Sequence, residues 1–449
     1  MGKYFGTDGF RGKANETLTA THAFRVGRFL GNYFSQKGKR ARIVLGKDTR
    51  LSSYMFEYAL AAGATASGAD VYLLHVTTTP SVSFVARTEG FDCGVMISAS
   101  HNPYTDNGLK IVNSRGEKAD GEMIARLEDY LDGGELPFAT GEKIGRTVDY
   151  VAGRNRYLGF LLSLPRSSFR GLKIGLDCAN GSAWALSKAV FDALGAEVRA
   201  IAAEPDGTNI NRECGSTSVS RLAAFVKENS LDLGFAFDGD ADRCICVDER
   251  GERVDGDGIL YVCARYLAAR GELDKNGVVC TVMSNLALPR ALAREGIGCV
   301  QTKVGDKNVY AEMVRGGYCL GGEQSGHIIF RKHETTGDGI LTALFLTELV
   351  LESKCPLSCL TEGYRPMPQY LMSVRTRDKA AVLQSERVRE ATARAEELLG
   401  SGRLLVRPSG TEPLVRILAE GEDARACETA AKLVGRALRE AEEGLCAES

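Results

Sequence analysis

The sequence lacks the features that mark several classes of protein. No stretch approaches 18 uninterrupted apolar residues, which excludes an ordinary membrane-spanning helix. Residues 1–8 contain no apolar core of the kind a secretory signal needs. The net charge is only −2, so no overall basic character favours nucleic acid or an anionic membrane as a partner. We therefore expect no membrane and no nucleic-acid partner.

The cysteines also lack a disulfide or zinc pattern. The chain has 13 of them, an odd number, scattered along its length and without C-x-x-C spacing. Cys178, Cys263, Cys280 and Cys319 lie in apolar segments, where a thiol behaves as a small hydrophobic side chain. This pattern predicts reduced thiols and a cytoplasmic protein.

What the chain does contain is typical of a globular protein. Its 449 residues predict about three domains at roughly 150 residues each, and 44% of them are hydrophobic. Many of the 51 glycines follow apolar runs, as in 177–181, 238–242 and 321–326. Glycine at a strand end lets the backbone approach a ligand closely, although most of these glycines are expected to serve turns alone.

Short apolar runs alternate with helical patterns, which favours an α/β fold with mainly parallel sheets. The same order of strand, helix, strand and third strand occurs three times. Its strands are expected at 42–45, 71–74 and 91–100, at 173–176, 198–201 and 231–238, and at 278–282, 299–302 and 316–323. The third strands end at Ser100, Asp238 and Glu323. Because ligands lie beyond the carboxyl ends of such strands, these three residues are predicted to face one cleft.

The last part of the chain has a different pattern. Pro366 and Pro368 indicate a linker. Strands at 370–375, 403–407 and 414–419, with helices at 385–399 and at the C-terminus, then predict a small α+β domain. Its loop 407–411 is the obvious functional surface.

The strongest single motif is Asp238-Gly-Asp-Ala-Asp-Arg243. Two like charges about 4 Å apart repel by about 4 kcal/mol at an effective dielectric constant of 20, so three carboxylates in one loop favour a divalent cation. Ligation by oxygen alone favours Mg²⁺ or Ca²⁺ over zinc. An EF-hand is excluded because Arg243 stands where its loop needs glycine, and strand-like segments flank the motif. We predict Mg²⁺; a structural Ca²⁺ site and a solvated acidic loop are the alternatives.

The segment Ser98-Ala-Ser-His-Asn-Pro103 follows a predicted strand, and Lys110 lies a few residues beyond it. A serine at a strand end, beside a histidine and within reach of a lysine, suggests a nucleophile or a phosphate carrier. The G-x-S-x-G motif of many hydrolases is absent from this segment. The alternative is a serine that only caps a turn.

Two further loops suit a phosphorylated sugar. Gly322-Glu-Gln-Ser-Gly-His327 offers hydrogen-bond donors and acceptors to vicinal hydroxyls, although a histidine in such a turn often serves structure alone. Arg407-Pro-Ser-Gly-Thr411, with Arg416, offers guanidinium groups and hydroxyls to a phosphate; the alternative is an exposed turn. Weaker signals are Gly6-Thr-Asp-Gly-Phe-Arg11, whose arginine could reach a phosphate, and Gly46-Lys-Asp-Thr-Arg50, which could brace a helix.

In this order along the chain, these loops resemble those of the α-D-phosphohexomutase superfamily, and the resemblance covers essentially the whole sequence. Segments 4–12, 205–211, 214–217, 322–327 and 336–339 resemble the bacterial branch that acts on glucosamine phosphates. One departure is Ser218-Val219, where the family pattern leads us to expect His-Pro. These positions lie outside the loops, so we expect altered packing and unaltered chemistry.

The resemblance implies an isomerase that interconverts glucosamine 6-phosphate and glucosamine 1-phosphate through a phosphoserine and a 1,6-bisphosphate, and so supplies UDP-N-acetylglucosamine and cell-wall synthesis. The alternatives are a phosphoglucomutase or phosphomannomutase on the same scaffold, or a sugar-phosphate sensor without catalysis. It also implies four domains around a central cleft, placed at 1–152, 153–252, 253–366 and 367–449, a cytoplasmic location and a possible homodimer.

The resemblance assigns roles to individual residues. Ser100 would carry the phosphoryl group, and one oxygen of the phosphoserine would complete a Mg²⁺ site formed by Asp238, Asp240 and Asp242. Groups expected to handle protons or neutralise charge are His101, Lys110 and Arg243. Residues expected to bind substrate are Thr7, Arg11, Glu323, Ser325, His327, Arg407, Ser409, Gly410, Thr411 and Arg416.

Overall fold

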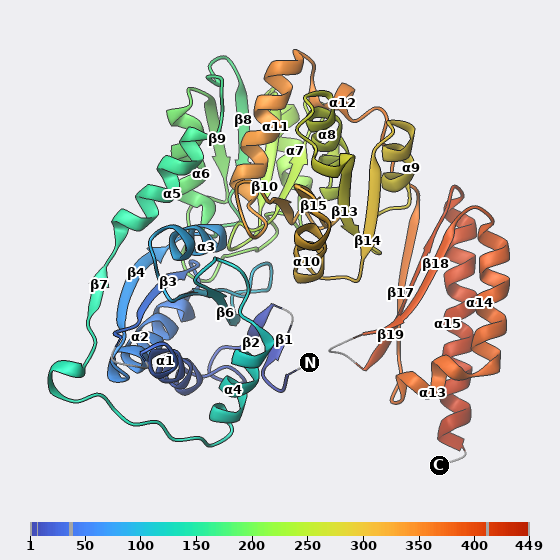
Figure 1. Ribbon diagram of the computed structural model, residues 1–449. Helices are drawn as coiled ribbons and strands as arrows, with labels where there is room; N and C mark the ends of the chain where they lie inside the picture. The colour runs from blue at the N-terminus through green and yellow to red at the C-terminus, as the bar shows by residue number, and fades with distance from the viewer. Residues whose placement is uncertain (1, 7, 36–38, 410–412, 448–449) are drawn as a thin grey trace. The chain divides into compact units, whose positions relative to one another are not determined.

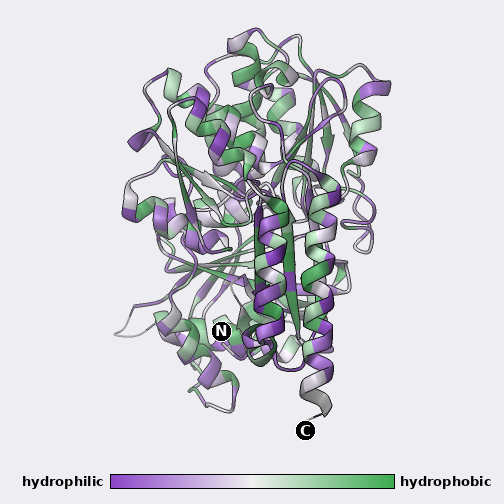
Figure 2. Cartoon of the chain, turned by 90° about the vertical axis from the view of Figure 1, so that its right-hand side faces the viewer, coloured by the Kyte–Doolittle hydropathy of each residue, from purple (hydrophilic) through white to green (hydrophobic). Residues whose placement is uncertain are grey.

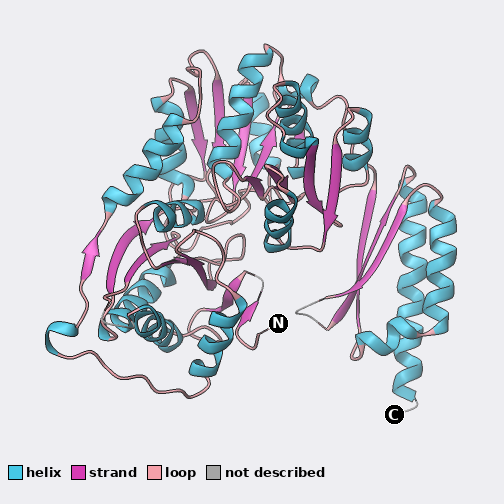
Figure 3. Ribbon diagram, viewed as in Figure 1, coloured by secondary structure: helices cyan, strands magenta, loops and turns pink. Residues whose placement is uncertain are grey.

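The structure is a computed structural model that describes residues 2–6, 8–35, 39–409 and 413–447. The chain forms two compact units (Figure 1). The larger unit comprises Met1–Met283 and Glu295–Glu362, and the smaller comprises Ser284–Arg294 and Gly363–Ser449. Magenta strands with cyan helices packed around them make up both units (Figure 3). Within the described residues, no helix is both long and apolar enough to cross a membrane.

The first sheet of the larger unit has seven strands in the order β1-β2-β6-β5-β3-β4-β7. Side chains alternate between its two faces, so Ile43 and Leu45 of β3 enter one core while Val44 enters another. The strands are β1 (Phe5–Gly6), β2 (Gly9–Lys13), β3 (Arg42–Lys47), β4 (Asp70–Val76), β5 (Cys93–Ile97), β6 (Asp106–Asn113) and β7 (Thr147–Asp149). The helices are α1 (Ala20–Phe34), α2 (Leu51–Ala66), α3 (Thr79–Thr88), α4 (Gly121–Leu131) and α5 (Val151–Ser163).

The larger unit contains two further sheets. The second has the order β12-β11-β10-β8-β9 and the third β14-β13-β15-β16. Their strands are β8 (Lys173–Asp177), β9 (Glu197–Ile201), β10 (Leu233–Phe237), β11 (Cys244–Val247), β12 (Arg253–Val254), β13 (Gly277–Thr281), β14 (Gly298–Thr302), β15 (Leu320–Gly322) and β16 (Ile328–Phe330). The helices of this region are α6 (Ala183–Ala193), α7 (Ser220–Glu228), α8 (Gly256–Ala269), α10 (Asp306–Gly316), α11 (Gly339–Ser353) and α12 (Leu357–Leu360).

The predicted threefold repeat is confirmed by the strand order. Each sheet contains four strands in which the third strand lies between the first and an antiparallel fourth, as β6-β5-β3-β4, β11-β10-β8-β9 and β16-β15-β13-β14. The fourth strands β6 and β16 were not part of the expected pattern. In every repeat, the turn between the third and fourth strands carries one of the predicted functional motifs.

The smaller unit is the predicted α+β domain. Its antiparallel sheet has the order β17-β19-β18 and packs with two long helices around a shared core. Both helices alternate between hydrophilic and hydrophobic residues along their length, as amphipathic helices on a sheet do (Figure 2). The elements are β17 (Gln369–Arg375), α13 (Lys379–Gln384), α14 (Glu386–Leu399), β18 (Arg403–Pro408), β19 (Leu414–Glu420) and α15 (Ala424–Ala447).

Helix α9 (Ala287–Arg294) belongs to the smaller unit, although it precedes the predicted linker by many residues. Arg403 explains this packing, because its guanidinium group donates to the carbonyl of Ser284 (2.8 Å) and pairs with Glu420. The Glu420 carboxylate also accepts the backbone N–H of Leu286 (2.8 Å). This packing depends on pairs more than 100 residues apart, which the order of elements does not reveal.

Candidate active site

Ser100 lies in the turn that follows β5 and is almost completely buried. Its φ is +53°, in the left-handed region that residues other than glycine seldom adopt. The Ser100 hydroxyl donates to Asp238 Oδ2 (2.5 Å), and the Nδ1 atom of His101 lies 3.3 Å from Ser100 Oγ. The Ser100 N–H donates to the hydroxyl of Ser98 (2.9 Å). The turn therefore directs the predicted carrier oxygen at the acidic loop of the second repeat.

Two side chains hold the backbone of this turn in place. The fully buried guanidinium group of Arg50 donates to the carbonyls of Ser100 (2.8 Å) and Asn102 (2.9 Å) and pairs with Asp48 (2.7 Å). Asn211 donates its amide to the same two carbonyls (2.9 and 3.0 Å). Arg50 was expected only to brace a helix, and the role of Asn211 had no signal beyond its place in segment 205–211.

The three aspartates form a buried cluster at the turn between β10 and β11. Carboxylate oxygens of Asp238, Asp240 and Asp242 all lie within 4.8 Å of one another. Burial and the charges of Asp242 and Asp240 raise the pKa of Asp238 well above its usual range. One oxygen each of Asp240 and Asp242 is buried without a hydrogen-bond partner among the described residues. Unpaired buried carboxylate oxygens are costly, so this arrangement fits a metal ion.

Gly239 allows the acidic loop and the serine turn to approach each other. A Cβ atom at this position would lie 2.5 Å from the carbonyl oxygen of Ser100, closer than two such atoms can stand. The loop is also held by Thr79 at the start of α3, which donates its backbone N–H to the Asp240 carbonyl (2.9 Å) and its hydroxyl to the Asp240 carboxylate. The two repeats therefore meet through backbone as well as side chains.

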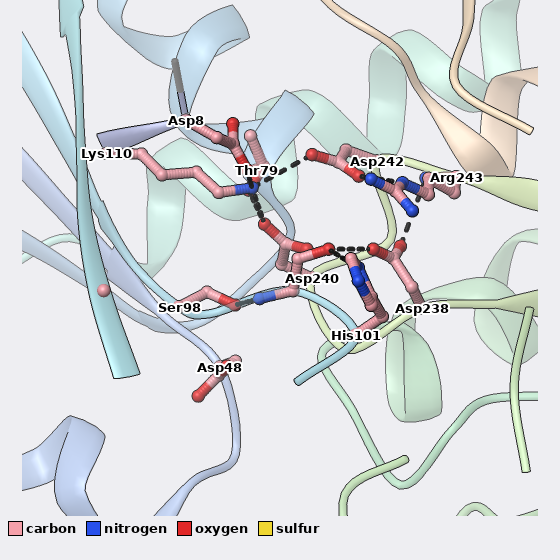
Figure 4. Close-up of polar contacts among 12 residues, drawn as sticks. Asp8, Asp48, Thr79, Ser98, His101, Lys110, Asp238, Asp240, Asp242 and Arg243 are labelled. Atoms are coloured by element: carbon pink, nitrogen blue, oxygen red, sulfur yellow. Dashed lines mark hydrogen bonds and ion pairs between the residues drawn. The ribbon is translucent and has the colours of Figure 1, made fainter. Parts of the chain in front are cut away.

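Lys110 of β6 offsets part of this negative charge. Its ammonium group lies 2.6 Å from Asp240, 3.0 Å from Asp242 and 3.6 Å from Asp8 (Figure 4). Burial alone would lower the pKa of Lys110, but Asp240, Asp242 and Asp8 raise it well above its ordinary value. Lys110 therefore stays protonated and acts as a fixed positive charge.

Asp8 connects this lysine to two other cations. It pairs with Arg11, one of the predicted substrate-binding residues, and with Lys118 (2.9 Å), which also reaches Asp306 (2.7 Å). Sequence reasoning did not single out Asp8 or Lys118. Their contribution depends on contacts that span more than 100 residues.

His101 and Arg243 lie on the Asp238 side of the acidic cluster, away from Lys110 (Figure 4). Burial, together with the charges of Arg243 and Arg11, lowers the pKa of His101 to about 4, so its imidazole is neutral near pH 7. The backbone N–H of Arg243 donates to Asp238 Oδ1 (3.2 Å). Burial opposes the charge of its guanidinium group, but Asp238, Asp242, Asp8 and Glu323 raise the pKa of Arg243.

The turn between β15 and β16 is the third loop of the predicted active site. Glu323 accepts the backbone N–H of Gly305 (3.0 Å), and both Glu323 and Ser325 remain partly exposed. His327, in contrast, is buried. Its Nε2 atom accepts the N–H of Gly337 (2.9 Å), and its Nδ1 atom lies 3.7 Å from Asp242. The structure therefore places His327 beside the acidic loop, and its predicted contact with substrate stays a prediction.

In the smaller unit, Arg407 of β18 stands directly opposite Arg416 of β19. Burial, and then the charge of Arg416, lowers the pKa of Arg407. Like charges that face each other across two paired strands destabilise the pairing, and an anion bound between them would offset this repulsion. The carbonyl of Ser409 accepts a hydrogen bond from Lys379 (2.7 Å). The predicted substrate-binding residues Thr7, Gly410 and Thr411 lie outside the described residues.

Comparison with known proteins places these loops in one family. Models of phosphoglucomutase/phosphomannomutase match the chain in four parts: α/β/α domain I at residues 2–137, domain II at 155–251, domain III at 255–367 and the C-terminal domain at 371–435. A solved phosphoglucomutase/phosphomannomutase family protein from Burkholderia thailandensis has a TM-score of 0.81 at 26% identity, with 99% of each chain covered.

The relatives with higher sequence identity are all named for one enzyme of this family. The phosphoglucosamine mutase of Lachnospira eligens is 58% identical, with 95% of this chain and 96% of the relative covered. That of Lachnoclostridium phytofermentans is 56% identical, with 98% and 99% covered, and that of Bacillus subtilis 47% identical, with 95% and 96% covered. With these matches and the geometry above, the chain belongs to the α-D-phosphohexomutase superfamily and, within it, to the phosphoglucosamine mutase family.

Proposed function

We infer that the protein is an isomerase that interconverts glucosamine 6-phosphate and glucosamine 1-phosphate through a phosphoserine and a glucosamine 1,6-bisphosphate, and so supplies precursors of cell-wall synthesis. The observation that carries this function is the direct contact between the Ser100 hydroxyl and Asp238 in a buried acidic cluster. The high identity to phosphoglucosamine mutases over nearly the whole chain supports the choice of sugar.

Phosphoryl transfer depends mainly on positioning and charge stabilisation. In the proposed reaction, the bond between phosphorus and Ser100 Oγ breaks while phosphorus bonds to the free hydroxyl oxygen of the sugar phosphate, and the hydroxyl proton passes to Ser100 Oγ. The resulting bisphosphate then reorients. Its other phosphoryl group is transferred to Ser100 Oγ, the Ser100 proton passes to the sugar oxygen that is left, and the phosphoserine is regenerated. Arg50 and Asn211 hold the backbone of Ser100 throughout, and Lys110 supplies a permanent positive charge beside the acidic loop.

We propose Mg²⁺ as the metal. Asp238, Asp240, Asp242 and an oxygen of phosphorylated Ser100 would hold it, because an all-oxygen set of ligands suits this hard cation. When bound, the cation supplies charge stabilisation for the transferred phosphoryl group. The unpaired oxygens of Asp240 and Asp242 support this assignment.

Turnover of three sugar phosphates tests the proposed substrate. Glucosamine 1-phosphate should give the highest kcat/KM, with glucose 1-phosphate and mannose 1-phosphate lower by at least about tenfold, since one lost hydrogen bond costs on the order of 1.4 kcal/mol. Turnover is measured for each sugar with the same phosphorylated enzyme and metal concentration. An equal or higher kcat/KM with glucose 1-phosphate or mannose 1-phosphate would assign the chain to the alternative phosphoglucomutase or phosphomannomutase activity. No turnover of any of them, with Ser100 phosphorylated, would favour a sensor.

Arg407→Ala tests the phosphate clamp. Because Arg407 and Arg416 would bind the phosphate that is not transferred, the variant should raise KM by about 10- to 100-fold, the effect of losing a charge-assisted hydrogen bond. Steady-state kinetics measure KM and kcat separately. Arg387→Ala is the matched control, since this exposed arginine of α14 pairs with Glu440 on the surface and was not assigned to substrate. An unchanged KM in Arg407→Ala would remove the clamp from the mechanism.

Three further predictions belong to this proposal. Among the described cysteines, none forms a disulfide, which supports a reducing, cytoplasmic location. The boundaries of four domains at 152, 252 and 366 are proposed on the sequence pattern.

A homodimer is proposed on the family resemblance alone, and the mass of the native particle in solution tests it.

A further inference from the structure

The larger unit contains a cavity of about 650 Å³ that none of the predicted site residues lines. Its walls come from the beginnings of α2 and α6, from α5, from the loop after β4 and from residues 205–207. Helices α5 and α6 lie side by side at this place (Figure 1). Segment 205–211 was singled out in the sequence, and the proposed reaction does not use Pro205, Asp206 or Gly207. The volume lies within the range of sites for small molecules.

Several groups that line the cavity suit an anion. The helix α6 begins here with Ser182 at its N-cap, and the Ser182 side chain caps no backbone N–H of the helix. The Ser182 hydroxyl, in a residue 3% exposed, is buried without a hydrogen-bond partner among the described residues. The same holds for the hydroxyl of Thr77, in a residue 1% exposed that lines the same cavity. An unpaired hydroxyl at the positive end of a helix dipole, with a second unpaired hydroxyl in the wall of the same cavity, favours a phosphate.

A positive charge adds to this preference. Arg154 of α5 lines the cavity half-buried, and among the described residues no carboxylate pairs with it. The one acidic residue of the wall, Asp206, already accepts the backbone N–H groups of Thr208 and Asn209 and the Thr208 hydroxyl. These bonds lower the pKa of Asp206, so its carboxylate stays charged, and the proposed anion would have to bind near Arg154 and away from Asp206.

The other part of the wall suits a ring. Trp184 and Tyr54 are 40% and 44% exposed, and both line the cavity together with the exposed Leu51. Lys47 covers one face of the Tyr54 ring, with its Nζ atom 4.2 Å from the ring centroid. Partly exposed aromatic rings beside polar groups are typical of sites that stack a sugar or a base. Trp184 is also the only tryptophan of the chain.

We propose that this cavity is a second binding site, separate from the acidic cluster, for a small phosphorylated ring compound. The phosphate would lie against Ser182, Thr77 and Arg154, and the ring against Trp184 and Tyr54. A sugar phosphate and a nucleotide share this chemistry.

The site lies directly behind the catalytic turns. The backbone N–H of Ser182 donates to the carbonyl of Gly239 in the acidic loop (2.8 Å). Thr49, which precedes Arg50, donates its hydroxyl to the carbonyl of Asn180 (2.6 Å), and the N–H of Leu51 donates to Gly207 (2.9 Å). A ligand in the cavity would therefore contact the residues that support both turns.

Tryptophan fluorescence tests the proposal, because Trp184 alone provides the signal. The full chain is titrated separately with inorganic phosphate, glucosamine 6-phosphate and uridine monophosphate. At least one ring compound should give a saturable change and bind at least tenfold more tightly than inorganic phosphate. Tighter binding of the sugar or of the nucleotide then identifies the source of the ring.

Three variants locate the signal. Arg154→Gln should weaken binding at least tenfold, while Arg156→Gln, on the same helix but paired with Glu89, should leave it unchanged. Arg407→Ala should also leave it unchanged, because the clamp belongs to the proposed active site. The proposal is overturned by no saturable change with any compound, by equal affinities in wild type and Arg154→Gln, or by rings that bind no better than phosphate. Turnover is assayed independently, so a failure to detect binding at this cavity would not contradict the proposed reaction.

Discussion

Ser100→Ala should reduce turnover by more than about 10³-fold, because the variant has no oxygen to carry the phosphoryl group. The fold should persist: the backbone of this turn is held by Arg50 and Asn211, whose bonds do not involve the deleted hydroxyl. Turnover of glucosamine 1-phosphate measures the loss, and far-ultraviolet circular dichroism checks the fold. Intact mass should show a phosphate on the wild type that is absent from the variant.

Ser98→Ala is the matched control for this experiment. It removes a neighbouring hydroxyl that accepts the N–H of Ser100, so it should slow turnover by about tenfold or less while Ser100 remains phosphorylated. If Ser100→Ala kept turnover within tenfold of the wild type, another group would carry the phosphate and the proposed mechanism would be wrong.

Asp240→Asn should lower turnover by about 10²- to 10³-fold and raise the Mg²⁺ concentration needed for half-maximal activity. The substitution removes one of three charges that favour the cation and leaves Lys110 with a weaker partner. A second readout does not depend on activity. Mg²⁺ should raise the melting temperature of the wild type, because a ligand of the folded state stabilises it, and this rise should shrink or vanish in the variant.

Asp248→Asn provides the comparison. Asp248 is also buried and lies a few residues further on, but it accepts backbone N–H groups of its own turn at Arg250 and Glu252. Its replacement should lower the melting temperature and leave the response to Mg²⁺ intact. Identical Mg²⁺ dependence of Asp240→Asn and wild type, in both activity and melting, would contradict the metal assignment.

The sequence alone was sufficient to predict the architecture of the repeats. Apolar runs such as 42–45 and 233–237 are short, bounded by turn residues and buried on both faces, which is what a parallel strand requires. The acidic motif was equally clear, because three aspartates at alternate positions have few explanations other than a cation. Ser100 and Asp238 were predicted to face one cleft, and the structure brings their side chains into contact.

The residues that support the site were harder to predict. Arg50 lies 50 residues from Ser100, Asn211 lies 111 residues away, and Thr79 reaches Asp240 across 161 residues. Each is an ordinary polar residue in its local sequence. The role of Arg50 follows from the packing of loops within the first repeat, and the roles of Asn211 and Thr79 follow from the packing of the first repeat against the second. Lys110 shows the same limit. Its position shortly after Ser100 can be read from the sequence, but its bonds to Asp240 and Asp242 cannot.

The matching strand order of the three sheets has a consequence for the ancestry of the site. Ser100, Asp238 and Glu323 all lie at the same hairpin, between the third strand and its antiparallel neighbour. The proposed carrier, metal ligand and sugar contact thus occupy one equivalent structural position in the three repeats, as triplication of a single ancestral segment would produce. Substitutions at the partly exposed positions 323–325 should then change specificity without altering the sheets that carry Ser100 and Asp238, because β15 and β16 belong to a separate sheet.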